Sequence, residues 1–170
     1  MDITQLILDD HAEQRRLFAL IEQIDPADTR SLSAVWRRLS TFLEVHAETE
    51  EKVFYPALLK VGRRAGKKDE AEEETLDAIK DHNEIRDAVA SAGKKKVGST
   101  AWYDAVAAAN KANGDHMAEE EREGLTSFRR FASLDLRHRL GVSFIAYETR
   151  HVDGVVPVDK DPETWVEEHG

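Results

Sequence analysis

Four histidines recur along the chain at nearly equal intervals. They are His11, His46, His82 and His116, and the intervals between them are 35, 36 and 34 residues. Midway between successive histidines lie the segments DPADT, GRRAGKK and GKKKVGST, which are rich in residues that turn the chain or break helices. If each segment reverses the chain between antiparallel helices, the four imidazoles lie at one level of a helical bundle. Because imidazole is a frequent metal ligand, this level is a candidate metal site.

Two glutamates follow two of these histidines at a helical spacing. Glu50 lies four residues after His46, and Glu120 lies four residues after His116. At about 100° per residue, a spacing of four leaves the two side chains about 40° apart and about 6 Å apart along the axis. These carboxylates are therefore predicted to share a metal with the histidines. Glu119, at a spacing of three, lies near the same face, but Glu120 repeats the spacing of the other pair and is preferred.

Other acids and histidines near this pattern are expected to take no part in binding. Three glutamates lie two residues after a histidine, roughly 200° around the helix from it, and should face solvent. They are Glu13, Glu48 and Glu84. Glu51 and Glu121 are also expected to point away from the site. The remaining histidines, which lie outside the repeated level, are expected to be exposed or to contact the site only from outside. They are His138, His151 and His169.

The alternative interpretation is that the repeated histidines are purely structural. Four buried imidazoles and two buried carboxylates would then have to satisfy one another without a cation. Residual charge of this kind is costly in a medium of low dielectric constant. The metal site is therefore the favoured interpretation.

Helical periodicity runs through nearly the whole sequence and predicts five helices. The expected ranges are 3–24, 30–61, 70–93, 100–132 and 134–151. Residues typical of helix ends flank these ranges, namely Pro26, Gly62, Gly93, Ser99 and Ser133. Pro56 lies inside the second range and is expected to kink its last turn. The predicted fold is all-α, an antiparallel up-and-down four-helix bundle with an additional C-terminal helix and an irregular tail.

The sequence also divides into a bundle and an accessory region. Residues 1–132 are expected to form the bundle, and residues 133–170 to pack on it as a helix and tail. The tail after His151 contains two prolines and two glycines and has little periodicity. It is predicted to be a loop with one anchoring turn around Trp165.

Composition and charge exclude several kinds of partner and chemistry. The net charge of −10 repels phosphates, so nucleic acids and anionic membranes are not expected as partners. The chain has no cysteine, which excludes disulfides, thiolate ligands and cysteine nucleophiles and fits a reducing compartment. The first residues, MDITQLILDDH, lack a basic region before their apolar run, so no secretion signal or membrane span is expected. A cytoplasmic location is the resulting expectation.

The acidic runs EAEEE and EEERE are interpreted as solvated helix faces, with uptake of cations as the less favoured alternative.

The residues around the four histidines resemble the hemerythrin-like, or HHE cation-binding, domains. These domains bind two irons inside a four-helix bundle. The resemblance covers roughly residues 5–130 and rests on DH at 10–11, HAETEEKVFYPAL at 46–58, DHNEIR at 81–86 and HMAEEE at 116–121. It implies a non-haem centre of two iron ions, in which zinc or manganese can replace iron. The implied metal ligands are His11, His46, Glu50, His82, His116 and Glu120.

The chain departs from the members of this family that carry oxygen. Those members have an additional histidine one turn from the ligand of the third helix, and this chain has Ala78 and Arg86 at those places. Two octahedral ions offer about twelve positions, of which the six residues and one bridging oxygen fill about ten. The resemblance therefore implies a centre that binds or reacts with a small ligand such as O2, peroxide or NO. A metal-binding sensor or iron buffer acting through an unknown protein partner and a peroxide-decomposing enzyme remain as alternatives.

Further residues are expected to support such a centre. Glu50 and Glu120 would bridge the two metals. Tyr55 is expected to act either as a redox-active or hydrogen-bonding phenol or through the packing of its ring. Apolar neighbours are expected to exclude bulk water from the centre. They are Phe18, Leu43, Val53 and Ile79.

Overall fold

The computed structural model describes residues 1–170, and it contains helices and no strand. The long helices are α1 (Ile3–Gln23), α2 (Thr29–Thr49), α4 (Lys68–Gly93) and α5 (Thr100–Arg122). A π-helical segment, η1 (Glu50–Phe54), joins α2 to α3 (Tyr55–Arg64). The chain ends with α6 (Gly124–Phe131), α7 (Leu134–Arg150) and α8 (Pro162–His169). The prediction of an all-helical chain is confirmed.

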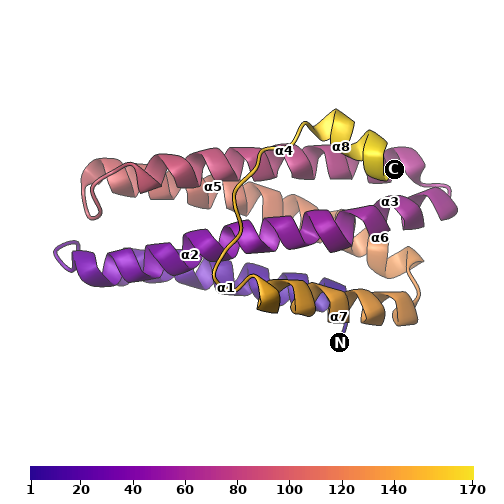
Figure 1. Cartoon of the computed structure of the whole chain (residues 1–170), viewed down its shortest axis with the longest axis horizontal. Coiled ribbons are helices and arrows are strands. Elements are labelled where there is room, and N and C mark those ends of the chain that lie inside the picture. Colours follow the sequence, from indigo (N-terminus) through magenta and orange to yellow (C-terminus); the bar gives the residue numbers. More distant parts are fainter.

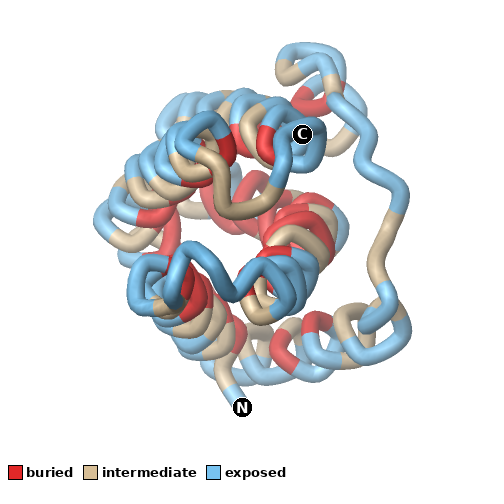
Figure 2. The backbone as a smooth tube through the Cα atoms, turned by 90° about the vertical axis from the view of Figure 1, so that its left-hand side faces the viewer, coloured by how far each residue is buried: buried red, intermediate tan, exposed pale blue.

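Four helical columns lie alongside one another along the long axis of the molecule (Figure 1). They are α1, α2 continued by η1 and α3, α4, and α5, and the chain reverses direction between successive columns. Seen along this axis, the buried residues line the inside of the columns and the exposed residues cover the outside (Figure 2). α7 packs against α1 and α2, and the chain then crosses to α4, where α8 packs.

Side-chain caps fix where most of the helices begin. Five helices have an N-cap side chain that accepts a hydrogen bond from a backbone N–H of the first turn, namely Asp2, Asp28, Ser99, Ser133 and Asp161. Such a cap is worth about 1 kcal/mol. α4 has no side-chain cap, but Asp69 and Glu70 in its first turn complement the positive end of the helix dipole.

The helix predicted over residues 30–61 differs from the structure near its end. Directly before Pro56, the helix widens into the π-helical turn Glu50–Phe54. Pro56 lies in the first turn of α3, directly after this π-helical turn. Gly62 does not end the helix, which continues to Arg64. The turn is made at Gly66, whose φ of 70° favours glycine.

The helix predicted over residues 100–132 is two helices, because the chain breaks at Glu123 between α5 and α6. At the break, the N–H of Gly124 donates a hydrogen bond of 3.0 Å to Oε1 of Glu74 on α4. A Cβ atom at position 124 would lie 2.7 Å from that oxygen, so a larger residue there would displace the carboxylate of Glu74. The tail also differs from its prediction, since it forms the eight-residue helix α8 instead of a single turn.

Two apolar clusters fill the two ends of the bundle. One contains Ile3 and Ile7 of α1, and the other contains Leu17 and Ile21 of the same helix. Between them α1 buries polar side chains, including His11. A polar layer therefore lies midway along the columns, with an apolar core on either side.

Candidate metal centre

The four histidines of the repeat meet in this polar layer. His11, His46, His82 and His116 come from α1, α2, α4 and α5, and none is more than 4% exposed. The ring centroids of His11 and His46 lie 5.2 Å apart, and those of His82 and His116 lie 4.7 Å apart. The imidazoles thus form two pairs, each joining neighbouring columns.

Glu50 lies between the two pairs, and its two oxygens face different pairs. Oε1 is 3.0 Å from Nε2 of His46 and 4.0 Å from Nε2 of His11. Oε2 is 3.3 Å from Nε2 of His82 and 3.9 Å from Nε2 of His116. Glu50 is fully buried. Because its two oxygens face different pairs, this one carboxylate could contact two cations, one beside each imidazole pair.

Glu120 closes the centre on the side of His11. Its Oε2 lies 3.4 Å from Nε2 of His11, and its Oε1 accepts a hydrogen bond of 2.8 Å from the hydroxyl of Tyr55. The buried Tyr55 ring also packs 5.8 Å from the ring of His82. Tyr55 therefore combines hydrogen bonding and packing, the two roles that its sequence position suggested.

Buried polar atoms without hydrogen-bond partners show that a cation fits this centre. Five of them belong to the predicted ligands, namely His11 Nε2, His46 Nε2, Glu50 Oε1, Glu50 Oε2 and Glu120 Oε2. The 3.0 Å contact between His46 and Glu50 does not have hydrogen-bond geometry. Each unpaired buried polar group costs about 1–3 kcal/mol, and cations between these atoms would remove that cost. Imidazole with carboxylate suits iron, manganese or zinc.

Five of the six predicted ligands fall into two groups that could each hold one ion, and Glu120 belongs to neither group. In each group the atoms lie within 4.8 Å of one another. One group is His11, His46 and Glu50, and the other is Glu50, His82 and His116. Because Glu50 belongs to both groups, the arrangement fits two ions that share one carboxylate.

Each imidazole is held from behind by a carboxylate close to its Nδ1 atom. The pairs are His11 with Glu121 (2.9 Å), His46 with Asp10 (3.1 Å), His82 with Glu51 (2.9 Å) and His116 with Asp81 (3.5 Å). A carboxylate at Nδ1 favours the tautomer that carries the proton there, which leaves the Nε2 lone pair directed into the centre. The four acids thus fix the orientation of the four rings.

Glu51 and Glu121, which were predicted to point away from the site, contact its histidines from outside. Both point away from the histidine of their own helix, as a spacing of five requires, but they reach the histidine of a neighbouring helix. The π-helical turn that begins at Glu50 also helps to bury Glu51. Asp10 and Asp81 were not predicted either. The dipeptide Asp-His, which occurs at both positions, is the sequence signal that could have found them.

Burial and neighbouring charges shift the pKa values of the centre in the absence of metal. Burial lowers the pKa of His46, but the charges of Glu50 and Asp10 raise it well above its ordinary value. Burial acts likewise on His116, whose pKa is raised to about 10 by its contacts with Asp81 and Glu50. Burial and the charge of Glu50 raise the pKa of Glu120 well above its usual range. Protons therefore take the place of cations when no metal is bound.

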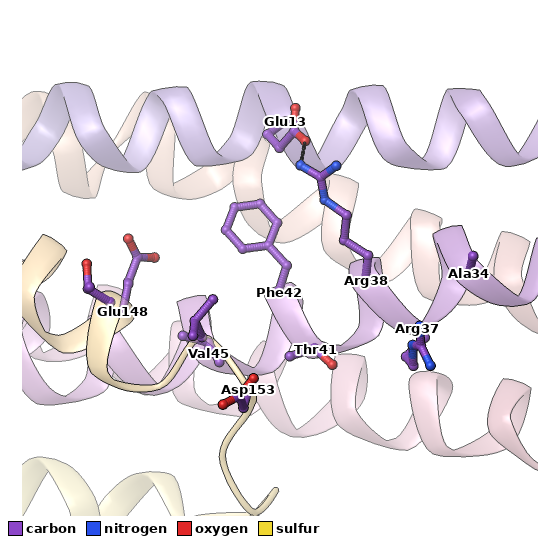
Figure 3. Close-up of a pocket in the computed structure, with 11 residues that line it drawn as sticks. Glu13, Ala34, Arg37, Arg38, Thr41, Phe42, Val45, Glu148 and Asp153 are labelled. Atoms are coloured by element: carbon purple, nitrogen blue, oxygen red, sulfur yellow. Dashed lines mark hydrogen bonds and ion pairs between the residues drawn. The ribbon is translucent and has the colours of Figure 1, made fainter.

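A cavity of about 640 Å³ lies outside the centre, between α1, α2 and α7 (Figure 3). Phe42 and Glu148 line it, and both also approach His46 from outside. The ring of Phe42 lies 6.2 Å from that of His46. Of the apolar residues predicted to exclude water from the centre, Phe18, Leu43 and Ile79 are buried and Val53 is half-buried.

The two acidic runs of the sequence meet on the opposite surface. A cavity of about 480 Å³ is lined by Glu70, Glu73 and Glu74 of α4 and by Glu119 and Glu123 at the end of α5. Burial, with repulsion from Glu123 and Glu119, raises the pKa of Glu74 to about 7. The runs are therefore not simply solvated faces, because one of their carboxyls is half-buried between the helices.

Replacing Glu74 with glutamine is expected to stabilise the metal-free protein above pH 7. The Glu74 carboxyl has an ordinary pKa of 4.5 and a folded-state pKa of about 7, so the folded protein holds this proton more tightly than the unfolded chain. Its destabilising effect is therefore absent below pH 4.5, grows as the pH rises to 7, and is complete above pH 7. After allowance for solvent screening, Glu74→Gln should raise the free energy of unfolding, measured with urea, by about 1 kcal/mol at pH 8. At pH 4 it should leave this free energy unchanged. Glu73→Gln, on the exposed neighbour, is the control, and an equal gain at both pH values would contradict the expectation.

Comparison with protein-family models matches residues 2–125 to the hemerythrin HHE cation binding domain. The match covers most of the chain and includes all six predicted ligands. The chain belongs to this family. The resemblance predicted over residues 5–130 is thereby confirmed. Neither the comparison with curated proteins nor that with solved structures finds a match.

The other three histidines of the chain lie beyond the residues that match the HHE domain, and their contacts are away from the centre, as predicted. His138 lies 3.1 Å from the amino group of Met1. His151 stacks on Tyr147, and His169 stacks on Trp165. None of the helices combines the length and the apolar character that crossing a bilayer requires.

Ala78 and Arg86 occupy the two positions at which an additional histidine was considered, and each has another role in this HHE domain. Ala78 is buried among apolar residues at one end of the bundle. Arg86 is buried, and its guanidinium donates hydrogen bonds of 2.9 Å to Glu44 and 3.0 Å to Glu51. This position thus supplies a cation that supports the acid behind His82 and adds no ligand to the centre.

Proposed function

We propose that the HHE domain holds two non-haem iron ions and uses them to bind or react with a small ligand such as O2, peroxide or NO. The proposed ligands are His11, His46, Glu50, His82, His116 and Glu120. The observation that carries the proposal is the position of Glu50, whose two unpaired oxygens face two different imidazole pairs. Zinc or manganese would suit the same ligands, so the choice of iron rests on the family.

Each group of residues would have its own task in the proposed centre. When bound, the iron ions supply redox chemistry that amino-acid side chains lack. Glu50 and Glu120 would hold the two ions, and Tyr55 fixes Glu120 by donating a hydrogen bond from its hydroxyl group to Oε1. The acids behind the imidazoles fix the tautomers of the rings, and the two apolar clusters keep bulk water out.

The same ligand set argues against reversible oxygen carriage. Four imidazoles and two bridging carboxylates would fill about eight of the roughly twelve positions on two octahedral ions. Since Arg86 and Ala78 add no further ligand, positions remain for water or for an exogenous ligand. An open centre of this kind favours reaction or sensing.

We also propose a bundle and an accessory region for the chain. Residues 1–132 would form the antiparallel up-and-down four-helix bundle that holds the metal. Residues 133–170 would form the accessory helix and tail packed on it. A cytoplasmic location is proposed because the absence of cysteine fits a reducing compartment. The net charge of −10 makes nucleic acids and anionic membranes unfavourable partners.

Iron-loaded protein is expected to decompose peroxide, and His46→Ala is expected to lose this turnover. His46 contributes to one of the two groups of ligand atoms, so its removal disables the pair of ions. Peroxide consumption, measured beside the iron content of each protein, tests the expectation. His138→Ala, on a histidine away from the centre, is the control.

Other results would favour other functions. Tight binding of O2 or NO without turnover would support a sensor that acts through a protein partner. Iron binding with neither turnover nor small-ligand binding would support an iron buffer. Failure of iron to bind, together with unchanged thermal stability after chelation, would leave a structural bundle.

A further inference from the structure

The tail of the chain crosses from α7 to α4 and reaches the supports of the metal centre. After Arg150 the chain passes over α2, and α8 then packs on α4 (Figure 1). This crossing segment lies outside residues 2–125, which match the family. Lys160, at its end, is the residue that reaches inward.

Lys160 is joined to the imidazole of His82 through one carboxylate. Its Nζ contacts Oε2 of Glu51 and lies 2.8 Å from Oε2 of Glu48. The other oxygen of Glu51, Oε1, lies 2.9 Å from Nδ1 of His82 and accepts a hydrogen bond of 3.0 Å from Arg86. The two oxygens of Glu51 are thus held from opposite sides, one by the tail and the other by α4.

The backbone of Lys160 is fixed by the residue next to His82. The side-chain amide of Asn83 donates a hydrogen bond of 2.7 Å to the carbonyl of Lys160 and accepts one of 3.1 Å from its N–H. Directly after Lys160, Asp161 caps α8, and Trp165 of that helix is buried in an apolar cluster. The ammonium group therefore has a fixed anchor on both sides, which a freely moving surface lysine lacks.

Glu51 needs this second cation more than the other acids behind the imidazoles do. The side chains of Asp10, Asp81 and Glu121 are 20–28% exposed, so water can stabilise their charge, whereas that of Glu51 is 0% exposed. A buried carboxylate must be balanced by cations and hydrogen bonds. Arg86 is shared with Glu44, so Lys160 supplies the remaining positive charge.

We propose that Lys160 is a positioning residue for the metal centre, holding Glu51 so that the His82 ring directs Nε2 at its metal. The inference rests on the proposed metal centre and adds a residue from outside the HHE match. Without the ammonium group, Glu51 would turn toward Arg86 and water, and the His82 ring would lose its fixed orientation. The effect should fall on the ion beside His82 and His116, because the pair formed by His11 and His46 has its own supporting acids.

Replacing Lys160 with methionine is expected to weaken one of two metal-binding steps. Metal-free protein is titrated with cobalt(II) in competition with a chelator, and the visible absorption of bound cobalt reports the geometry of each site. Loss of a residue that supports a ligand weakens metal binding by about 10-fold or more. We therefore expect one step about 10-fold weaker with an altered spectrum, the other step unchanged, and recovery of both in Lys160→Arg. Lys52→Met is the matched control, because Lys52 lies 3.7 Å from Glu48 and has no contact with Glu51.

The thermal unfolding of each metal-free protein separates positioning from tail anchoring. If Lys160→Met lowers the unfolding temperature and leaves both cobalt affinities unchanged, Lys160 only anchors the tail and the inference is wrong. Equal weakening of both steps, or the same weakening in Lys52→Met, would also overturn it. If Lys160→Met does not fold, Lys160→Gln takes its place and must show the same selective loss. Wild-type protein that binds no cobalt and no iron would instead overturn the proposed centre itself.

Discussion

Replacing Glu50 with alanine is expected to abolish the binding of both metal ions. Glu50 is the residue shared by the two groups of ligand atoms, so its loss removes one ligand from each ion. Removal of a supporting residue weakens metal binding by about 10–100-fold, and loss of a shared ligand should exceed the upper end of that range. Metal content after dialysis, and cobalt titration of the metal-free protein, measure the effect.

The specificity of this result can be tested with a neighbouring acid. Glu84 also lies on one of the histidine-bearing helices, two residues after His82, but it is exposed and faces away from the centre. Glu84→Ala should bind two ions with wild-type affinity. Retention of one tightly bound ion in Glu50→Ala would show that the two groups of ligand atoms are independent, and the bridging role would be wrong. Circular dichroism of the metal-free Glu50→Ala protein checks that the helices are kept.

The helices could be predicted because their signals are local. Apolar periodicity and capping residues act within a turn or two, and Ser99 and Ser133 begin helices where the sequence placed them. The break at Glu123 could not be predicted this way. It depends on the contact between Gly124 and Glu74 of another helix, and no local pattern records a contact over 50 residues. The π-helical turn at Glu50 could not be predicted either. Glu50 and Glu51 are both buried there, whereas a regular α-helix would place these two side chains on different faces.

In the candidate site, too, residues on one helix could be predicted, and contacts between helices could not. The spacing of His46 and Glu50 fixes their common face, and the equal intervals place the four histidines at one level. The supporting acids were missed because each acts on a histidine of another helix, as Glu121 does on His11. Lys160 was missed for a stronger reason. It lies 109 residues from Glu51 in the sequence, in a segment whose composition suggested a loop.

The apolar clusters at both ends explain how the bundle can tolerate such a centre. Large side chains such as Trp102 at one end and Phe128 at the other are fully buried, and each contributes about 2–3 kcal/mol through burial. The helices can therefore associate without metal, with protons in place of cations in the polar layer between them. Metal binding should then add to the stability of a bundle that is already folded.

Removing the metal with a chelator is expected to lower thermal stability, and the loss should be larger at pH 8 than at pH 5. With free metal at about 1,000 times Kd, each site contributes about 4 kcal/mol. For a chain of this length that is a shift in Tm of roughly 10 °C per site. Metal binds only to deprotonated ligands, so its affinity and the stability that it adds both rise with pH.

The metal-free protein should show the opposite dependence on pH. His116 has an ordinary pKa of 6.5 and a folded-state pKa of about 10, so its proton stabilises the folded state fully below pH 6.5. This contribution is lost as the pH rises from 6.5 toward 10, and the raised pKa of His46 acts in the same direction. The difference in Tm between metal-loaded and chelated protein should therefore widen steadily from pH 5 to pH 9. A difference that stays constant, or full metal occupancy well below pH 5, would contradict ligation by histidine, and Glu50→Ala should show no effect of the chelator at any pH.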